Sequence, residues 1–215
     1  MHAHTQEALV NLTPERALYY LKEGNERFIN NLKLNRNLLQ QANNTSQGQF
    51  PFATILSCID SRTSAELIFD QGLGDVFSIR IAGNIVNEDI LGSMEFATKL
   101  VGTKIILVLG HTKCGAITGA CNGVELGHLT ALLRKVQPAI ARETQTTTNR
   151  TGTNRTFVER VTALNVHHTI DRIRQESPIV AALEKEGKIR VVGAMYNVKT
   201  GQVTFYDEAS GMGGA

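Results

Sequence analysis

Three short apolar runs separated by helix-like segments constrain the fold of this chain more than any other feature. They span residues 52–57, 76–82 and 104–109, and each run ends at or beside a glycine, a cysteine or a histidine. Runs of this length and apolarity are typical of strands that are buried on both faces of a sheet. Strands that alternate with helices predict an α/β domain with a mainly parallel central β-sheet flanked by helices.

Two more strands and four helices complete the predicted domain. Residues 188–194 form a fourth apolar run, and residues 201–206 follow a turn that would make them a last edge strand. Helical patterns cover four segments, namely 89–101, 125–143, 157–175 and 178–186, the last of which is closed by Gly187 as a C-cap. Residues 145–155 are rich in Thr, Asn and Gly, which predicts a mobile surface loop.

The first 49 residues differ in character from the rest. Thr13 followed by Pro14 and Glu15 is a typical helix start, with an N-cap, a proline at the first helical position and an acidic first turn. Residues 35–50 are polar and rich in Asn and Gln, which favours an irregular connection or an arm that lies on another surface. We therefore expect a helical arm over residues 1–49 and one α/β domain over residues 50–215.

Charge and cysteine content narrow the functional classes. The 215 residues carry 22 basic and 20 acidic side chains, so no strong field favours nucleic acid or an anionic membrane as the partner. No apolar run approaches the ~20 residues of a membrane span, and the first residues lack a secretory pattern. Three cysteines without an export signal predict reduced thiols, and we expect a cytoplasmic protein that acts on a small molecule.

A histidine and a cysteine follow the third apolar run, in the stretch Gly110-His-Thr-Lys-Cys-Gly115. A phosphate-binding loop would need lysine directly after the second glycine, and Ala116 stands there instead. The spacing of His111 and Cys114 lets both side chains approach one metal ion, but this short pattern arises easily by chance. A structural histidine and a buried cysteine are the alternative.

Cys58 strengthens the metal interpretation because it also follows an apolar run. The carboxyl ends of parallel strands lie at one sheet edge, so Cys58, His111 and Cys114 would meet there if their strands are neighbours. Two thiolates and one imidazole suit zinc, and three protein ligands leave the fourth tetrahedral position open, as in catalytic sites. We find no fourth ligand, and Cys121 is better explained as a buried apolar residue.

The residues after Cys58 add a carboxylate and a guanidinium. A phosphatase would need an arginine about six residues beyond its cysteine nucleophile, whereas Arg62 comes earlier and Asp60 would repel phosphate. On a turn after the strand, Asp60 and Arg62 can pair while Asp60 faces the metal. The carboxylate would then lie within hydrogen-bond reach of a water molecule on the ion.

The two motifs Cys58-Ile-Asp-Ser-Arg62 and Gly110-His-Thr-Lys-Cys-Gly115 resemble those of the β-class carbonic anhydrases. The resemblance extends over most of residues 50–206 through four more colinear stretches, which are Phe69-Asp-Gln-Gly-Leu-Gly-Asp-Val-Phe77, Arg80-Ile-Ala-Gly-Asn84, Leu91-Gly-Ser-Met-Glu-Phe96 and Gly193-Ala-Met-Tyr196. It implies one Zn²⁺ per subunit on Cys58, His111 and Cys114, with Asp60 and Arg62 as a catalytic dyad. The implied reaction is attack of a zinc-bound hydroxide on CO2 to give bicarbonate and a proton.

The resemblance also implies a pocket and an assembly. Gln49 would hydrogen-bond the substrate, and Phe77, Ala82 and Gly115 would line the pocket, whereas Ile85 either joins them or packs in the core. The implied assembly is a homodimer, or a tetramer or larger, in which the arm of residues 1–49 packs on the partner and Gln49 and Phe77 complete the neighbouring site.

Departures from the family pattern and rival functions remain open. Phe96 stands where plant-type members carry a tyrosine, Ala116 replaces a common glycine, and the absence of tryptophan argues against a regulatory bicarbonate site of the kind some bacterial members have. A hydrolase of CO2 analogues such as CS2 or COS on the same scaffold is one alternative. A non-catalytic zinc or thiol module is the other, although it would have no use for Asp60 and Arg62.

Overall fold

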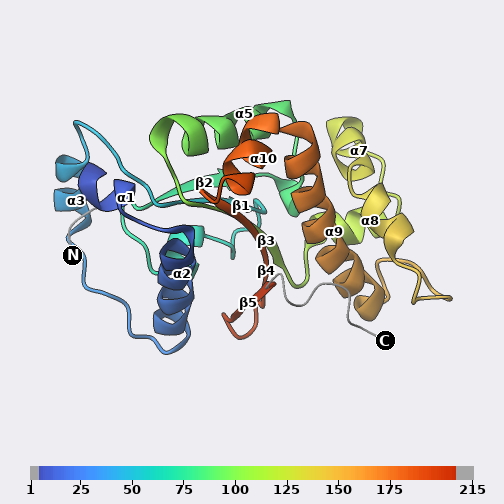
Figure 1. Cartoon of the computed structure of the whole chain (residues 1–215). Coiled ribbons are helices and arrows are strands. Elements are labelled where there is room, and N and C mark those ends of the chain that lie inside the picture. Colours follow the sequence, from blue (N-terminus) through green and yellow to red (C-terminus); the bar gives the residue numbers. More distant parts are fainter. Residues whose placement is uncertain (1–4, 207–215) are drawn as a thin grey trace.

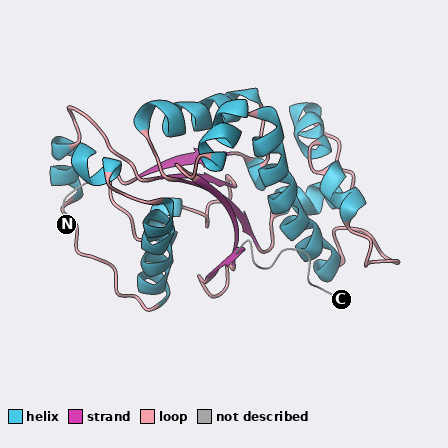
Figure 2. Ribbon diagram, viewed as in Figure 1, coloured by secondary structure: helices cyan, strands magenta, loops and turns pink. Residues whose placement is uncertain are grey.

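The computed structural model describes residues 5–206, and a five-stranded sheet runs through its centre (Figures 1 and 2). The strands are β1 (Ala53–Ser57), β2 (Val76–Arg80), β3 (Ile105–His111), β4 (Arg190–Tyr196) and β5 (Val203–Tyr206), in the spatial order β2-β1-β3-β4-β5. The first four strands are parallel, and β5 pairs antiparallel with β4 at the edge. The predicted α/β domain with a mainly parallel sheet is therefore confirmed.

The central strands β1 and β3 carry the predicted metal ligands Cys58 and His111 at their carboxyl ends. Every residue of both strands is buried, as expected for strands covered by helices on two faces. They pair in parallel with Ser57 opposite Leu109, so they end at the same edge of the sheet. Because β2 lies on the far side of β1, the strand order reverses between β1 and β3, which is where open α/β sheets form their binding crevice.

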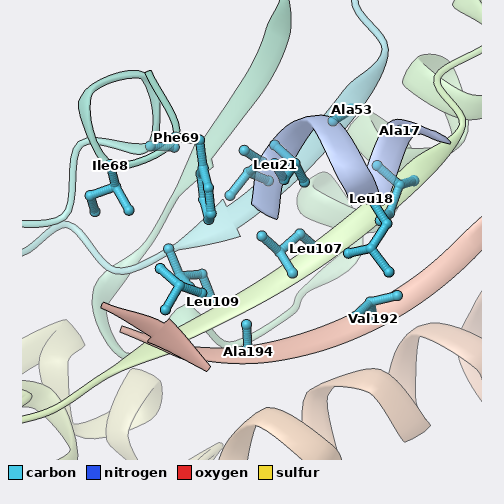
Figure 3. Close-up of a cluster of buried hydrophobic side chains, with 14 of the residues drawn as sticks. Ala17, Leu18, Leu21, Ala53, Ile68, Phe69, Leu107, Leu109, Val192 and Ala194 are labelled. Carbon is cyan, nitrogen blue, oxygen red and sulfur yellow. The ribbon is translucent and has the colours of Figure 1, made fainter. Parts of the chain in front are cut away.

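Helices cover both faces of the sheet. On one face lie α2 (Pro14–Ile29) and α4 (Ala65–Ile68), whose side chains pack with those of β1, β3 and β4, as the labelled residues of Figure 3 show. On the other face lie α5 (Glu88–Glu95), α9 (Arg155–Glu176) and α10 (Pro178–Lys185) (Figure 1). Within residues 5–206, no helix combines the length and the apolarity that crossing a membrane would require.

A third group of helices extends the domain beyond the sheet. It comprises α6 (Gly115–Cys121), α7 (Gly127–Arg134) and α8 (Gln137–Arg142), which pack with the first half of α9 around Ile117, Leu133 and Phe157. The prediction of a single helix over 125–143 is wrong, because one helix ends at Arg134 and the next begins at Gln137. Pro138 lacks a backbone N–H and fits the first turn of a new helix better than the interior of a long one.

The N-terminal region packs on the sheet of the same chain, through Leu9, Leu18 and Leu21. α2 starts as predicted, with the Thr13 hydroxyl accepting a hydrogen bond from Arg16 N (3.2 Å). Two short helices, α1 (Gln6–Val10) and α3 (Leu38–Asn44), lie on either side of it in sequence, and α3 forms within the segment predicted to be irregular. Asn37 caps α3 by accepting from Gln40 N (3.0 Å), which explains how so polar a segment begins a helix.

The remaining helical predictions hold with one difference of type. The segment predicted over 89–101 is α5 followed by a turn of π-helix, η2 (Phe96–Val101), which ends at Gly102 with a φ of 95°. α9 and α10 are where they were predicted, and Gly187 follows α10 with a φ of 68°. Residues 145–154 form a loop, and Arg150 holds it by donating to the buried carboxylate of Glu143 (2.7 Å).

Candidate metal centre

The structure brings together the three ligands predicted from the sequence. One ligand atom from each of Cys58, His111 and Cys114 lies within 4.8 Å of the other two. Cys58 directly follows β1, His111 is the last residue of β3, and Cys114 caps the start of α6. His111 and Cys114 are fully buried, and Cys58 is 4% exposed. The convergence follows from β1 and β3 ending side by side.

The hydrogen bond of His111 leaves one ring nitrogen free for a metal. Nδ1 lies 3.0 Å from the carbonyl oxygen of Thr112, and because a carbonyl only accepts, Nδ1 carries the proton. Nε2 is then an acceptor, and it is buried without a hydrogen-bond partner. A buried unpaired polar atom costs about 1–3 kcal/mol, so the free lone pair fits a cation bound at this point.

The two sulfur atoms also fit a shared ion. Their separation of 4.0 Å is far beyond a disulfide bond. Two zinc–sulfur bonds of about 2.3 Å at a tetrahedral angle would place the sulfurs ~3.8 Å apart.

Their protonation is coupled. The Cys114 thiol donates to Cys58 and, against the effect of burial, lowers the pKa of Cys58 to about 4 with help from Gly83 N–H. The Cys58 thiolate and burial in turn raise the pKa of Cys114. The pair therefore keeps one proton that a divalent cation would displace.

One coordination position is left open. Among residues 5–206, no other Cys, His, Asp or Glu belongs to this group of potential ligands. Cys121 lies on α6 outside the group, and burial raises the pKa of its thiol to about 11, in keeping with its interpretation as an apolar packing residue. Three protein ligands with a free fourth position are typical of catalytic zinc sites, whereas structural sites are usually closed by four.

Asp60 and Arg62 form the predicted pair beside this position. Arg62 donates from Nε to Asp60 Oδ1 (2.9 Å) and from Nη2 to Oδ2 (2.7 Å). This pairing, assisted by the Arg62 backbone N–H, holds the pKa of Asp60 well below its usual range. Asp60 lines the same cavity as Cys58, but it does not belong to the group of three potential metal ligands. Its carboxylate is thus ionised, oriented and free to accept a hydrogen bond.

Two residues that the sequence did not single out fasten the Cys58–Arg62 turn. Thr63 Oγ1 donates to the carbonyls of Cys58 (2.9 Å) and Asp60 (2.8 Å). Arg80 donates to the same two carbonyls, at 3.1 Å and 2.7 Å. Arg80 is the first residue of Arg80-Ile-Ala-Gly-Asn84, one of the stretches that carry the family resemblance, and this position could have pointed to a role at the site.

A cavity of about 410 Å³ reaches Cys58, which is the one of the three potential ligands among its lining residues. Cys58, Asp60, Ala82 and Gly115 line part of it, so two residues predicted to line a substrate pocket share a cavity with Cys58. The remaining wall is mostly apolar and consists of Ile59, Ala116, Gly119, Val124, Leu129 and Leu133. Ile85 is buried in the same apolar cluster as Cys58, Ile117 and Leu133, and it does not line the cavity.

Gln49 and Phe77 lie elsewhere in this chain. Gln49 is exposed and lines a separate cavity with Phe50 and Lys104, near the amino ends of β1 and β3. Phe77, on the edge strand β2, lines another cavity of about 610 Å³ together with Phe96, whose ring centroid is 6.4 Å away. The structure of one chain therefore does not bring these two residues to Cys58.

Known proteins resemble this chain over most of its length. The sequence profile of a family described as carbonic anhydrase matches residues 53–203. Carbonic anhydrase 2 of Mycobacterium tuberculosis is 32% identical over 209 residues, which cover 94% of this chain and 98% of that protein. A carbonic anhydrase of Mycolicibacterium smegmatis is 31% identical over 90% of this chain and 93% of its own length.

Solved structures share the fold. The β-carbonic anhydrase of Coccomyxa in complex with acetazolamide superposes with a TM-score of 0.69 at 25% identity, covering 76% of this chain and 75% of that one. Tetrameric β-carbonic anhydrases of Sordaria macrospora give a TM-score of 0.67 at 24% identity, covering 80% of this chain and 87% of the other.

Proposed function

Because this chain belongs to the β class of the carbonic anhydrases, we propose that it catalyses the zinc-dependent, reversible hydration of CO2 to bicarbonate and a proton. The observation that carries the proposal is the convergence of Cys58, His111 and Cys114, with Asp60 lining the same cavity as Cys58. Two thiolates and one imidazole favour zinc over the hard divalent cations, which prefer oxygen ligands.

Asp60, Arg62 and the cavity wall have different roles around the proposed zinc site. When bound, zinc supplies a Lewis acid that activates water as a nucleophile near neutral pH. Asp60 accepts a hydrogen bond from the attacking water and fixes its orientation toward CO2. Arg62 neutralises Asp60 and, by holding both oxygens, keeps the carboxylate out of the fourth ligand position. The apolar wall that includes Ala82 suits a small substrate without charge.

We further propose that the active assembly is a homodimer in which Gln49 and Phe77 of each chain complete the cavity of the other. Both residues lie outside the Cys58 cavity of their own chain. The segment before Gln49 also exposes apolar side chains, with Leu39 of α3 73% exposed, and Phe96 beside Phe77 is 52% exposed. Larger assemblies of such dimers, like the Sordaria tetramers, are compatible with this arrangement.

Mixed dimers test the shared site. Cys58→Ala chains would lose their own metal, and Gln49→Leu chains would lose the polar contact with substrate. If Gln49 acts in the partner's cavity, co-expression of the two variants yields dimers with one complete site, and CO2 hydration recovers. If Gln49 acts within its own chain, the mixture stays as inactive as the separate variants.

The reaction itself is tested by stopped-flow CO2 hydration, with metal content measured on the same purified sample. We expect about one zinc per chain and hydration that disappears when zinc is removed by a chelator and returns when zinc is restored. Zinc-loaded protein without hydration activity would overturn the proposal. Assays with CS2 and COS on that sample distinguish the alternative hydrolase, and zinc binding without turnover of any of the three would indicate the non-catalytic module.

A further inference from the structure

A short turn supplies the hydrogen bond that Cys58 receives on its sulfur. The turn is η1 (Ala82–Asn84), and Gly83 N–H donates to Cys58 Sγ at 3.3 Å. Gly83 has a φ of 70° and Asn84 a φ of 42°, so both residues adopt the left-handed conformation. A non-glycine residue in that region needs support from its surroundings to persist.

That support comes from two side chains of α9. Asn165 donates from Nδ2 to the carbonyl oxygen of Gly83 at 2.8 Å, and Thr169 donates from Oγ1 to the carbonyl oxygen of Asn84 at 3.2 Å. The two donors are one helical turn apart, so they reach two consecutive carbonyls of the turn. Gly83 is therefore fixed at both ends, by Cys58 at its N–H and by Asn165 at its carbonyl.

The burial of these donors is informative. Asn165 is fully buried and Thr169 nearly so, on a helix whose neighbouring inward positions carry Val161 and Val166. Burying an amide or hydroxyl costs free energy unless it is hydrogen-bonded. Thr162 is a third buried polar residue of α9. Its hydroxyl donates to Val158 O (2.7 Å), within the same helix. Only Asn165 and Thr169 direct their hydrogen bonds at the η1 turn.

We infer that Asn165 and Thr169 are positioning residues, which hold the η1 turn so that Gly83 N–H stays bonded to the Cys58 sulfur. The inference rests on the proposed zinc site. Two thiolates together cancel both positive charges of a divalent ion, which weakens its pull on the electrons of a bound water. An N–H donor withdraws charge from the sulfur, so the ion keeps more of its Lewis acidity. The turn thus adjusts the metal through its ligand without touching substrate.

The test compares Asn165→Leu and Thr169→Val with Thr162→Val as the matched control and Thr169→Ser as the conservative variant. Each protein is loaded separately with zinc and with cobalt, and loading is verified by metal analysis. In Asn165→Leu and Thr169→Val, we expect the sulfur-to-cobalt charge-transfer band to move to longer wavelength, because the sulfur is more electron-rich without its donor. We expect kcat/KM for CO2 to fall about 10–100-fold at full zinc loading. Thr162→Val and Thr169→Ser should match the wild type.

Each outcome separates this inference from the proposed function. If the wild type takes up no metal or does not hydrate CO2, the proposed function fails. If the wild type does both and Thr169→Val shows the same band and the same kcat/KM as Thr162→Val, the positioning role is overturned. Should Asn165→Leu not fold, the pair Thr169→Val and Thr169→Ser still decides, because the first replaces the hydroxyl by a methyl group of similar size and the second keeps the hydroxyl and loses only a methyl group.

Discussion

Arg62 holds Asp60 at both carboxylate oxygens, although only one residue lies between them in the chain. The carboxylate is mostly buried, with 16% of the side chain exposed, while 48% of the Arg62 side chain remains exposed. A side-by-side guanidinium–carboxylate pair of this kind fixes direction as well as charge. Asp60 is thereby held in the cavity that Cys58 lines, with at least one lone pair available.

The first prediction concerns the charge of Asp60. Asp60→Asn keeps the size of the side chain but replaces an acceptor-only group with one that also donates, so the nucleophilic water loses its orientation. We expect zinc to remain stoichiometric while kcat/KM for CO2 falls by about 10²–10⁴. Stopped-flow hydration and metal analysis on one sample measure both. Full activity in zinc-loaded Asp60→Asn would show that the assigned role is wrong.

The second prediction concerns Arg62. Lysine carries the same charge but cannot hold two oxygens in a planar arrangement. In Arg62→Lys, Asp60 is released from one of its contacts and becomes a competing zinc ligand, so we expect retained zinc, reduced hydration and an added oxygen ligand from protein in X-ray absorption spectra. Arg142→Lys, in an exposed pair with Asp171, serves as the control and should leave all three unchanged. Unchanged coordination together with unchanged activity in Arg62→Lys would contradict the prediction.

The third prediction uses two cysteines of the same segment. Cys114 begins α6 as a potential ligand, and Cys121 ends it outside the metal group. We expect Cys114→Ser to lose zinc and activity, because a hydroxyl is a much weaker zinc ligand than a thiolate. Cys121→Ser should retain one zinc per chain and full hydration. Equal zinc content in the two variants, measured after dialysis, would rule out the proposed ligand set.

The strands and the convergence of the three potential metal ligands could be predicted because the signals are local or nearly so. The runs that became β1 and β3 are mostly apolar, as a strand buried on both faces requires, and β1 adds only the small polar residues Thr54 and Ser57. Cys58 and His111 follow those runs directly, so parallel pairing alone was enough to bring them together. The break before α8 was missed because apolar spacing continues across it, although Pro138 was the signal.

Other features depend on contacts that no local pattern encodes. The partner of Asn165 is a backbone carbonyl 82 positions away, and Arg80 also contacts only backbone at the site. The π-helical turn that begins at Phe96 has the same apolar periodicity as a continued α-helix over so short a length. The roles proposed for Gln49 and Phe77 need a second chain, which a single sequence does not describe.

The fourth prediction is a pH dependence of stability that originates at Asp70. This buried carboxylate pairs with Arg27 and Arg36 (2.5 Å each), which joins α2 and the segment after it to the turn after α4. Burial acts to raise the pKa of Asp70, but the two guanidiniums outweigh it, and the net pKa is lowered. Because the unfolded pKa is about 3.9, the stabilisation is complete above that value and is lost as pH falls toward the folded pKa.

Urea unfolding at several pH values measures this contribution. We expect Asp70→Asn to lose about 3–5 kcal/mol at pH 7, because two guanidiniums are left with a neutral partner, and the difference from wild type should shrink below pH 4. The matched control is Asp171→Asn, which breaks an exposed pair with Arg142 and should cost only about 0–1 kcal/mol at any pH. A pH-independent difference for Asp70→Asn would contradict the assignment.

The last prediction concerns the glycine inside α2. An added Cβ on Gly24 would lie 1.8 Å from the carbonyl oxygen of Phe69, and a backbone atom cannot yield as a side chain can. Glycine normally weakens a helix interior by about 1 kcal/mol relative to alanine, but here it lets α2 lie against the segment after α4. We therefore expect Gly24→Ala to lower the free energy of unfolding by about 1–3 kcal/mol in urea titrations. Gly119→Ala in α6 is the matched control, because its added Cβ would meet Leu133 at an ordinary 3.5 Å, and it should gain up to about 1 kcal/mol. If both substitutions stabilise, α2 does not pack as closely as the structure shows.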